Sequence, residues 1–458
     1  MRQQEVIEER YRQMTEEPIP RLVCTLAVPT IISMLITAIY NMADTFFVSK
    51  LGTSATGAVG VAFSLMAIIQ AIGFTCGQGA GNYISRLLGQ REDEKASKVA
   101  ATGFITAFLL GTIIMLVGLL GLEPLIRLLG ATDTIVPYAK QYVGIILIGA
   151  PCMAASFVIN NVLRYQGSAM YAMWGITAGG VLNLVLDPLF IFGFDMGIAG
   201  AALATIISQL ASFGILFYSA GVKGSLKIEF KKFTPSWEIY KEILRGGLPS
   251  FYRQGLASVA MMVLNLCAGA FGDAAIAAMS IVNRVFQFAF SALIGFGQGF
   301  QPVCGFNYGA KHYDRVKEAF WFCVKVACGT LIVLAIGIFW SAPRVIGIFS
   351  KTDVRVLEIG TRALRLQSLV FPLGAWSVMC NMLLQTIGKG TQASLLALAK
   401  QGLFFIPTLL IFSSQLGITG IQLSQPIADV LTFMLALPFG ISILRELNHL
   451  QETDLESS

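Results

Sequence analysis

The sequence predicts an all-α polytopic membrane protein with twelve transmembrane helices, arranged as two six-helix lobes related by a pseudo-twofold axis along the membrane normal. Three observations support this fold class: the composition, the number of long apolar stretches and an internal repeat. Of the 458 residues, 55% are hydrophobic and 13% are charged, and the mean hydropathy is +0.71. Soluble domains carry about 25% charged residues. The composition therefore excludes a soluble protein.

Twelve stretches of the sequence are long and apolar enough to cross a bilayer. A transmembrane helix needs about 20 apolar residues to cross a hydrocarbon core about 30 Å thick. Each stretch that reaches this length is expected to form one transmembrane helix. The stretches cover residues 22–50, 55–84, 97–121, 135–163, 168–194, 197–220, 246–271, 275–303, 318–341, 355–384, 393–414 and 417–444.

Glycine and proline residues recur at an offset of about 220 positions. Pro29 corresponds to Pro249, Gly52 to Gly272 and Gly197 to Gly417. Each half then holds six helices, an even number, so both halves start on the same side of the membrane, which is typical of parallel-repeat transporters. The expected domains are a cytoplasmic N-terminal segment, an N-lobe, a cytoplasmic linker, a C-lobe and a cytoplasmic tail, at residues 1–20, 21–220, 221–245, 246–445 and 446–458.

Basic residues mark the cytoplasmic side. They cluster before the first helix and in alternate loops, at residues 86–98, 223–245 and 311–317. The positive-inside rule therefore places both termini in the cytoplasm. The net charge of +6 reflects this bias, so nucleic acid is not an expected partner. The N-terminal twenty residues lack the apolar core of a secretory signal peptide.

The sequence offers little for catalysis or for a structural metal. The eight cysteines lie in apolar stretches or at their ends, without a CxxC pair, and are expected to be free thiols. Only two histidines are present. We find no HExxH motif, no acidic metal motif and no Ser/His pairing at membrane depth, so the protein is not expected to be an enzyme and no cofactor is expected.

Two carboxylates are predicted at membrane depth, Asp44 in the first helix and Asp187 in the fifth. They lie six and seven residues before the predicted outer ends of their helices, which at 1.5 Å per residue is about 10 Å inside. An acid in a membrane is a functional-site hypothesis by default, because burying its charge is costly. Snorkelling or helix capping is the structural alternative, and it explains one acid better than two acids at the same depth.

Polar residues of four helices are expected near these acids. Tyr142 and Thr205 lie seven or eight residues inward from the outer starts of the fourth and sixth helices. Asn183 and Tyr40 lie one helical turn from Asp187 and Asp44. These groups can converge on one pocket in the N-lobe.

The second half is expected to differ in chemistry. Leu264 and Pro407 occupy the places that correspond to Asp44 and Pro188, so no acid is expected at this depth in the C-lobe. Arg284 lies inside the eighth helix and is expected to face the cleft or a polar partner. Pro29 and Pro249 occupy equivalent places in the first helix of each half and can bend those helices.

Several motifs together resemble the multidrug and toxic compound extrusion (MATE) transporters, and the resemblance covers all twelve predicted helices. Within that family the chain resembles the branch that keeps both the helix-one acid and an Asn-x-x-x-Asp pair on helix five. The motifs are Asp44-Thr45-Phe46-Phe47-Val48 with Leu51-Gly52, Gly77-Gln78-Gly79, Gly297-Gln298-Gly299, Pro302 with Asn307-Tyr308-Gly309-Ala310, and Gly197-Ile198-Ala199-Gly200.

The resemblance implies a cation-coupled antiporter that exports amphiphilic, often cationic drugs by alternating access. It implies a multi-pass protein of the bacterial inner membrane, embedded in lipid and acting as a monomer. Asp44, Asn183, Asp187 and Thr205 match the N-lobe cation-coupling positions. Tyr40 and Asn160 match positions that line the N-lobe cavity, to which Tyr142 and Arg284 are added as candidates. Helices seven and ten lack the acid of a C-lobe cation site, and their nearest polar residues are Gln254 and Asn381.

The coupling ion is open between H⁺ and Na⁺. Burial and a second negative charge both favour the protonated form of an Asp44/Asp187 pair. The same carboxylates, with Asn183 and Thr205, also offer the oxygen ligands that suit Na⁺. The alternative function is a flippase for a lipid-linked precursor, of related two-lobed architecture. It would require a more basic central cleft, for which Arg284 is the only strong candidate.

Overall fold

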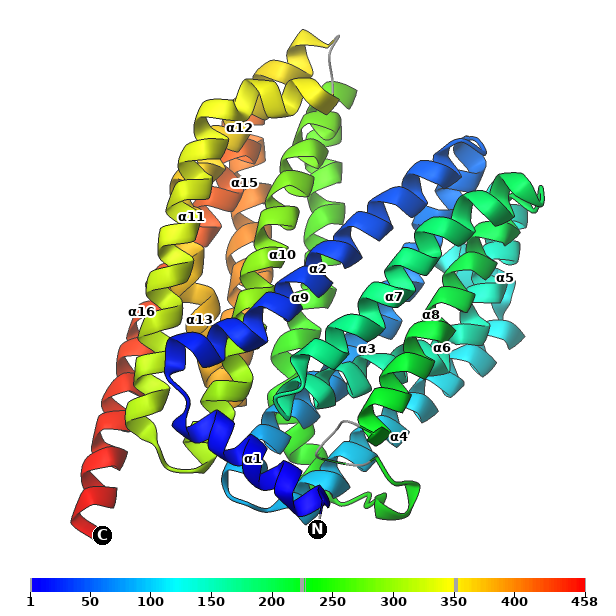
Figure 1. Ribbon diagram of the computed structural model, residues 1–458. Helices are drawn as coiled ribbons and strands as arrows, with labels where there is room; N and C mark the ends of the chain where they lie inside the picture. Colours follow the sequence, from blue (N-terminus) through cyan, green and yellow to red (C-terminus); the bar gives the residue numbers. More distant parts are fainter. Residues whose placement is uncertain (1, 223–225, 227, 350–352, 458) are drawn as a thin grey trace.

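The computed structural model describes residues 2–222, 226, 228–349 and 353–457. Within these residues the chain is helical and contains no strand. Residues 223–225 and 227 of the predicted linker lie outside the described residues. Both chain termini lie at one end of the helical bundle, which we call the termini end (Figure 1).

The first half of the chain forms one lobe. A short helix, α1 (Arg2–Glu16), lies across the termini end before the first long helix (Figure 1). The lobe then consists of α2 (Ile19–Ser49), α3 (Thr53–Gly89), α4 (Asp93–Leu120), α5 (Leu122–Leu128), α6 (Val136–Tyr165), α7 (Ala169–Pro188) with its π-helical continuation η1 (Leu189–Gly193), and α8 (Gly197–Val222).

The second half forms the other lobe, after a short 3₁₀ turn, η2 (Phe230–Lys232). It consists of α9 (Trp237–Gly269), α10 (Asp273–Gly309), α11 (Tyr313–Phe349), α12 (Val354–Val370), α13 (Leu373–Thr386), α14 (Gly390–Leu398), the π-helical η3 (Ala399–Phe405), α15 (Ile406–Leu416) and α16 (Ile418–Ser457). Helix α9 begins nine residues before the predicted span at 246, so it takes up part of the predicted linker.

The twelve predicted spans are confirmed, although one of them, α9, is less apolar than the others. In the described part of the chain, ten helices are long and apolar enough to cross a membrane, and α12 and α13, joined at a 57° bend, form another span. Helix α9 has 33 residues and packs on α3, α10 and α14. Arg253, Gln254 and Asn265 make it less apolar than the other spans.

The internal repeat recurs in the structure. Helices α3 and α10 begin at Thr53 and Asp273, 220 residues apart. Each is preceded by a glycine with positive φ, Gly52 at 111° and Gly272 at 95°. Glycine adopts this backbone conformation without the steric cost that other residues incur. The π-helical segments η1 and η3 also fall in corresponding spans.

The two lobes meet at the termini end and diverge toward the opposite end (Figure 1). Helix α3 packs on α9, and α2 packs on α10. Glycines allow this close approach, because a Cβ at Gly79 would lie 1.9 Å from the carbonyl oxygen of Ile243, and one at Gly299 would lie 2.4 Å from the Cα of Ala27. Small residues at helix interfaces commonly serve this purpose in membranes.

Candidate functional site

Asp44 and Asp187 lie together inside the first lobe. Asp44 is on α2, five residues before its end at Ser49, and Asp187 is at the point where α7 continues into η1. Both side chains are buried, with exposed fractions of 7% and 0%. The two carboxylates interact electrostatically. Like charges in such a place repel each other, so a bound cation or proton would relieve the site.

Each carboxylate has at least one buried oxygen without a protein partner among the described residues. Asn183, one turn before Asp187, donates its Nδ2 to Asp187 Oδ1 at 3.2 Å. Among the described residues, Asp187 Oδ2 and Asp44 Oδ1 are buried and accept no hydrogen bond. Buried polar atoms are nearly always hydrogen-bonded. The two unpartnered oxygens therefore define the candidate site.

Two tyrosines face the acid pair. Tyr142 of α6 interacts electrostatically with Asp44 and Asp187 and lies near the hydroxyl of Thr205 of α8. Thr205 donates its own proton to the Ala201 carbonyl at 3.0 Å. Tyr40, one turn before Asp44, lies beside Gln209, a residue that was not predicted from the sequence.

Glycines on α7 explain how the acids come together. Helix α7 packs against α2 on one side and α8 on the other. A Cβ at Gly180 would lie 3.1 Å from a ring carbon of Tyr40, and one at Gly179 would lie 2.8 Å from the Cβ of Ser212. Without side chains at these two positions, α7 fits closely between its neighbours, and Asp187 comes within reach of the carboxylate on α2.

Asn160 lies away from this group. It is 18 residues after Tyr142 on α6, which is about 27 Å along a helix. Its Nδ2 donates to the carbonyl of Ala172 at 3.3 Å. The corresponding residue of the second lobe, Asn381, donates to Ala393 at 2.7 Å. The repeat therefore uses this asparagine to join two helices in both lobes, while its role in a cavity stays a prediction.

The other predicted residues also lie apart from the acid pair. Arg284 is an exposed residue of α10, and it forms none of the hydrogen bonds or ion pairs that the described part of the chain shows. Pro29 and Pro249 are buried inside continuous helices, α2 and α9. Their role in bending these helices stays a prediction.

A third carboxylate lies at membrane depth and was not predicted from the sequence. Asp429 lies on α16, eleven residues after its start at Ile418, or about 16 Å along the helix. It pairs with Lys400 of η3 at 3.5 Å. The prediction for the second lobe covered only the positions that correspond to Asp44 and Pro188, which are Leu264 and Pro407 and lie outside α16, so it did not include Asp429. Depth counting along the span at 417–444 would have found Asp429.

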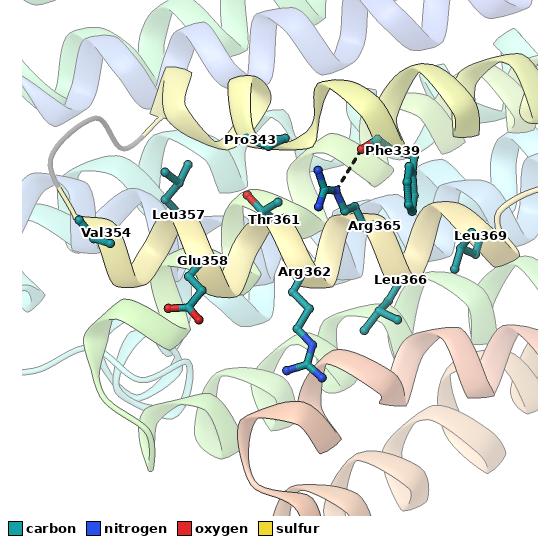
Figure 2. Close-up of a pocket in the computed structure, with 10 residues that line it drawn as sticks. All are labelled: Phe339, Pro343, Val354, Leu357, Glu358, Thr361, Arg362, Arg365, Leu366 and Leu369. Atoms are coloured by element: carbon teal, nitrogen blue, oxygen red, sulfur yellow. Dashed lines mark hydrogen bonds between the residues drawn. The ribbon is translucent and has the colours of Figure 1, made fainter.

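A cavity of about 560 Å³ lies elsewhere, between α11 and α12 (Figure 2). Its lining includes Arg362, Arg365 and Glu358 among apolar side chains, and Arg365 Nε donates to the carbonyl of Phe339 at 3.3 Å. A second cavity of about 410 Å³ lies between α3, α4 and α9. Neither is lined by a predicted site residue, so the acid pair rather than a cavity defines the candidate site.

Comparison with known proteins points to one family. The MatE family model matches residues 29–189 and 249–411, two segments that begin 220 residues apart. The chain is 30% identical over 417 residues to the multidrug export protein MepA of Staphylococcus saprophyticus, which covers 90% of this chain and 91% of that protein.

Solved structures show the same similarity. A crystal structure of MATE in complex with MaL6 superposes with a TM-score of 0.90 at 28% identity, covering 96% of this chain and 99% of that one. The outward-facing conformation of a multidrug resistance MATE family transporter of the MOP superfamily superposes with a TM-score of 0.89 at 28% identity, covering 95% and 98% of the two chains.

Proposed function

Because the chain belongs to the MatE family, we propose that it exports amphiphilic, often cationic drugs by alternating access, driven by inward flow of H⁺ or Na⁺. It acts as a monomer in the bacterial plasma membrane, with the termini end in the cytoplasm. The similarity to multidrug exporters supports the substrate class. The basic residues near the termini end support this orientation.

The observation that carries the coupling proposal is the pair of unpartnered oxygens on Asp44 and Asp187. Two buried carboxylates that interact with each other are costly unless a cation or proton neutralises them. One proton shared by the pair would satisfy both oxygens. A Na⁺ ion would find hard oxygen ligands in the same two carboxylates and in the hydroxyl of Thr205.

Coupling arises because the drug and the coupling ion compete for the state of the N-lobe in which both carboxylates are ionised. With both carboxylates ionised, the lobe attracts a cationic drug. Uptake of H⁺ or Na⁺ from the outside removes that attraction, and the drug is released. A ligand shifts a conformational equilibrium only by its differential affinity for the two states, so the ion and the drug must prefer opposite charge states of Asp44 and Asp187. This linkage is reciprocal.

The test uses purified protein in proteoliposomes that carry an imposed H⁺ gradient or an imposed Na⁺ gradient. We expect Asp44→Asn and Asp187→Asn to abolish drug-dependent ion exchange, because a neutral amide cannot alternate between charge states. The matched control is Asp133→Asn, since Asp133 is an exposed acid paired with Arg127 at 2.7 Å. Wild-type exchange in both acid variants would contradict the proposal, and the gradient that drives wild-type export identifies the ion.

A further inference from the structure

Lys400 and Asp429 form an ion pair inside the second lobe. Lys400 lies on the π-helical segment η3, and Asp429 lies on α16. The distance from Lys400 Nζ to Asp429 Oδ1 is 3.5 Å, and the side chains are 26% and 13% exposed. π-Helical segments occur frequently at functional sites. The low exposed fractions of the two side chains show that the lobe shields the pair, and the remaining exposure leaves it accessible to a ligand.

The carboxylate of Asp429 is held in place by two amides. Gln367 of α12 donates its Nε2 to Asp429 Oδ2 at 2.6 Å, and Gln425, one turn before Asp429, donates to Oδ1 at 3.2 Å. These bonds do not involve Lys400. The carboxylate therefore has a defined position that does not depend on the lysine.

The ammonium group of Lys400 also lies over an aromatic ring. Its Nζ is 4.0 Å from the ring centroid of Phe290 on α10. A cation over an aromatic face and beside a carboxylate is the arrangement by which proteins recognise organic ammonium ligands. Here the protein's own side chain provides the cation.

The two lobes differ in how their carboxylates at membrane depth are neutralised. In the repeat, α8 corresponds to α16, and α7 with η1 corresponds to α14 with η3. The first lobe has two carboxylates on α2 and α7, each with an unpartnered oxygen. The second lobe has one carboxylate on α16 and a lysine on η3 that neutralises it. In the first lobe an external cation would meet two carboxylates that no basic side chain of the described residues neutralises. In the second lobe it would have to displace Lys400 from Asp429.

We propose that Asp429 and Phe290 form a binding subsite for the cationic group of an exported drug, and that Lys400 occupies this subsite when no drug is bound. The inference rests on the proposed drug-export function. When a drug cation enters, the lysine moves away, and its return favours release of the drug. Lys400 is then a competitor that keeps drug affinity low.

The subsite is tested with the purified full-length protein in detergent and tetraphenylphosphonium as the probe, measured by equilibrium binding. We expect Lys400→Met to tighten Kd about tenfold or more, because a competing and repelling charge within about 5 Å is removed while the carboxylate remains. In the Lys400→Met background, Asp429→Asn is expected to abolish that gain. Phe290→Leu is expected to weaken binding roughly threefold to tenfold.

The matched control is Lys389→Met. Lys389 forms an ion pair with Glu446 in the same lobe, so this change removes the same charge and one ion pair elsewhere. Its Kd is expected to stay within about twofold of wild type, as for other partly exposed pairs. A Kd for Lys400→Met that is unchanged or weaker would overturn the subsite and leave a structural ion pair.

A second variant decides the question if Lys400→Met does not fold. Lys400→Arg keeps the charge and can pair with Asp429 through two parallel hydrogen bonds, so we expect it to weaken tetraphenylphosphonium binding severalfold. Unchanged binding in this variant would overturn the subsite. If wild-type protein binds no organic cation at all, the proposed export function fails as well. Wild-type binding without the predicted change in the lysine variants contradicts the subsite alone.

Discussion

Arg86 of α3 and Glu242 of α9 form an ion pair of 2.7 Å between the two lobes. Both side chains are largely buried, with exposed fractions of 16% and 17%. Arg86 Nη1 also donates to the carbonyl of Ile387 at 3.5 Å, and Glu242 also pairs with Arg245 at 3.0 Å. One guanidinium therefore contacts two segments of the second lobe, and it stabilises the conformation in which the lobes meet at the termini end.

Glu242→Gln is expected to lower the free energy of unfolding by about 1–2 kcal/mol, because the change leaves the partly buried guanidinium of Arg86 without its counter-ion. Thermal unfolding in detergent measures this change. The control is Glu8→Gln, since Glu8 pairs with Arg91 at 3.2 Å but the two side chains are 47% and 58% exposed. That variant should stay within about 0.5 kcal/mol of wild type. Equal losses in the two variants would contradict a special role for the interlobe pair.

The same pair has a predictable pH dependence. Glu242 lies before the membrane span, and although burial raises the pKa of its carboxyl, the hydrogen bonds and charges of Arg86 and Arg245 outweigh burial and hold that pKa below its ordinary value. A depressed pKa gives stability that is complete above the ordinary glutamate value near 4.3 and is lost as pH falls through the native value. The wild-type advantage over Glu242→Gln should therefore be constant from about pH 5 to 8 and shrink below about pH 4.

Thermal unfolding of both proteins across this pH range checks the expectation. A difference that changes between about pH 6 and 8 would contradict it. If it holds, any dependence of transport on pH in that range arises from groups other than the Arg86/Glu242 pair.

Gly79→Ala is expected to separate the lobes where α3 packs on α9. The new Cβ would lie 1.9 Å from the carbonyl oxygen of Ile243, an atom of rigid helix backbone. Overpacking of this kind costs about 1–3 kcal/mol or more. Gly60→Ala in the same helix is the matched control, because a Cβ there meets no atom within 4 Å. That variant should be neutral or more stable by up to about 1 kcal/mol. Thermal unfolding of both variants measures the difference, and similar stabilities would argue against close packing at Gly79.

Much of the fold could be predicted from the sequence because its signals are local. Apolar length defines a span, and the 220-residue offset of Gly52 and Gly272 identifies the repeat, which recurs in the bounds of α3 and α10. The proximity of Asp44 and Asp187 also follows from depth. Two residues at the same depth in one six-helix lobe can be separated by no more than the width of that lobe.

The rest of the site depends on contacts that no local signal encodes. The position of Gln209 beside Tyr40 depends on how α8 lies against α2. Asn160 resembles a cavity residue in sequence, but its amide donates to the carbonyl of Ala172. The ion pair of Lys400 and Asp429 joins two spans, and a search of equivalent positions overlooks it because the two lobes place their acids on different helices.

Two glutamines 220 residues apart, Gln78 and Gln298, each accept a hydrogen bond from the opposite lobe. Ser250 donates to Gln78 at 2.9 Å, and Arg164 Nη1 donates to Gln298 at 2.6 Å. Both glutamines and Arg164 are buried. Arg164 forms no ion pair with an acid in the described part of the chain. Its guanidinium instead donates to Gln298 and to the neighbouring Asn161 and lies over the ring of Tyr165.

Gln298→Leu is therefore expected to cost more than Gln78→Leu. The first change removes a hydrogen bond to a buried charge, worth about 1.5–3 kcal/mol, whereas the second removes bonds between neutral groups, worth about 1 kcal/mol each. Thermal unfolding of both variants measures this difference. Arg164→Met and the double variant Arg164→Met/Gln298→Leu then complete a double-mutant cycle for Arg164 and Gln298. The double variant should be more stable than the sum of the single changes predicts, because no buried charge is left without a partner. Strict additivity would show that Arg164 and Gln298 do not depend on each other.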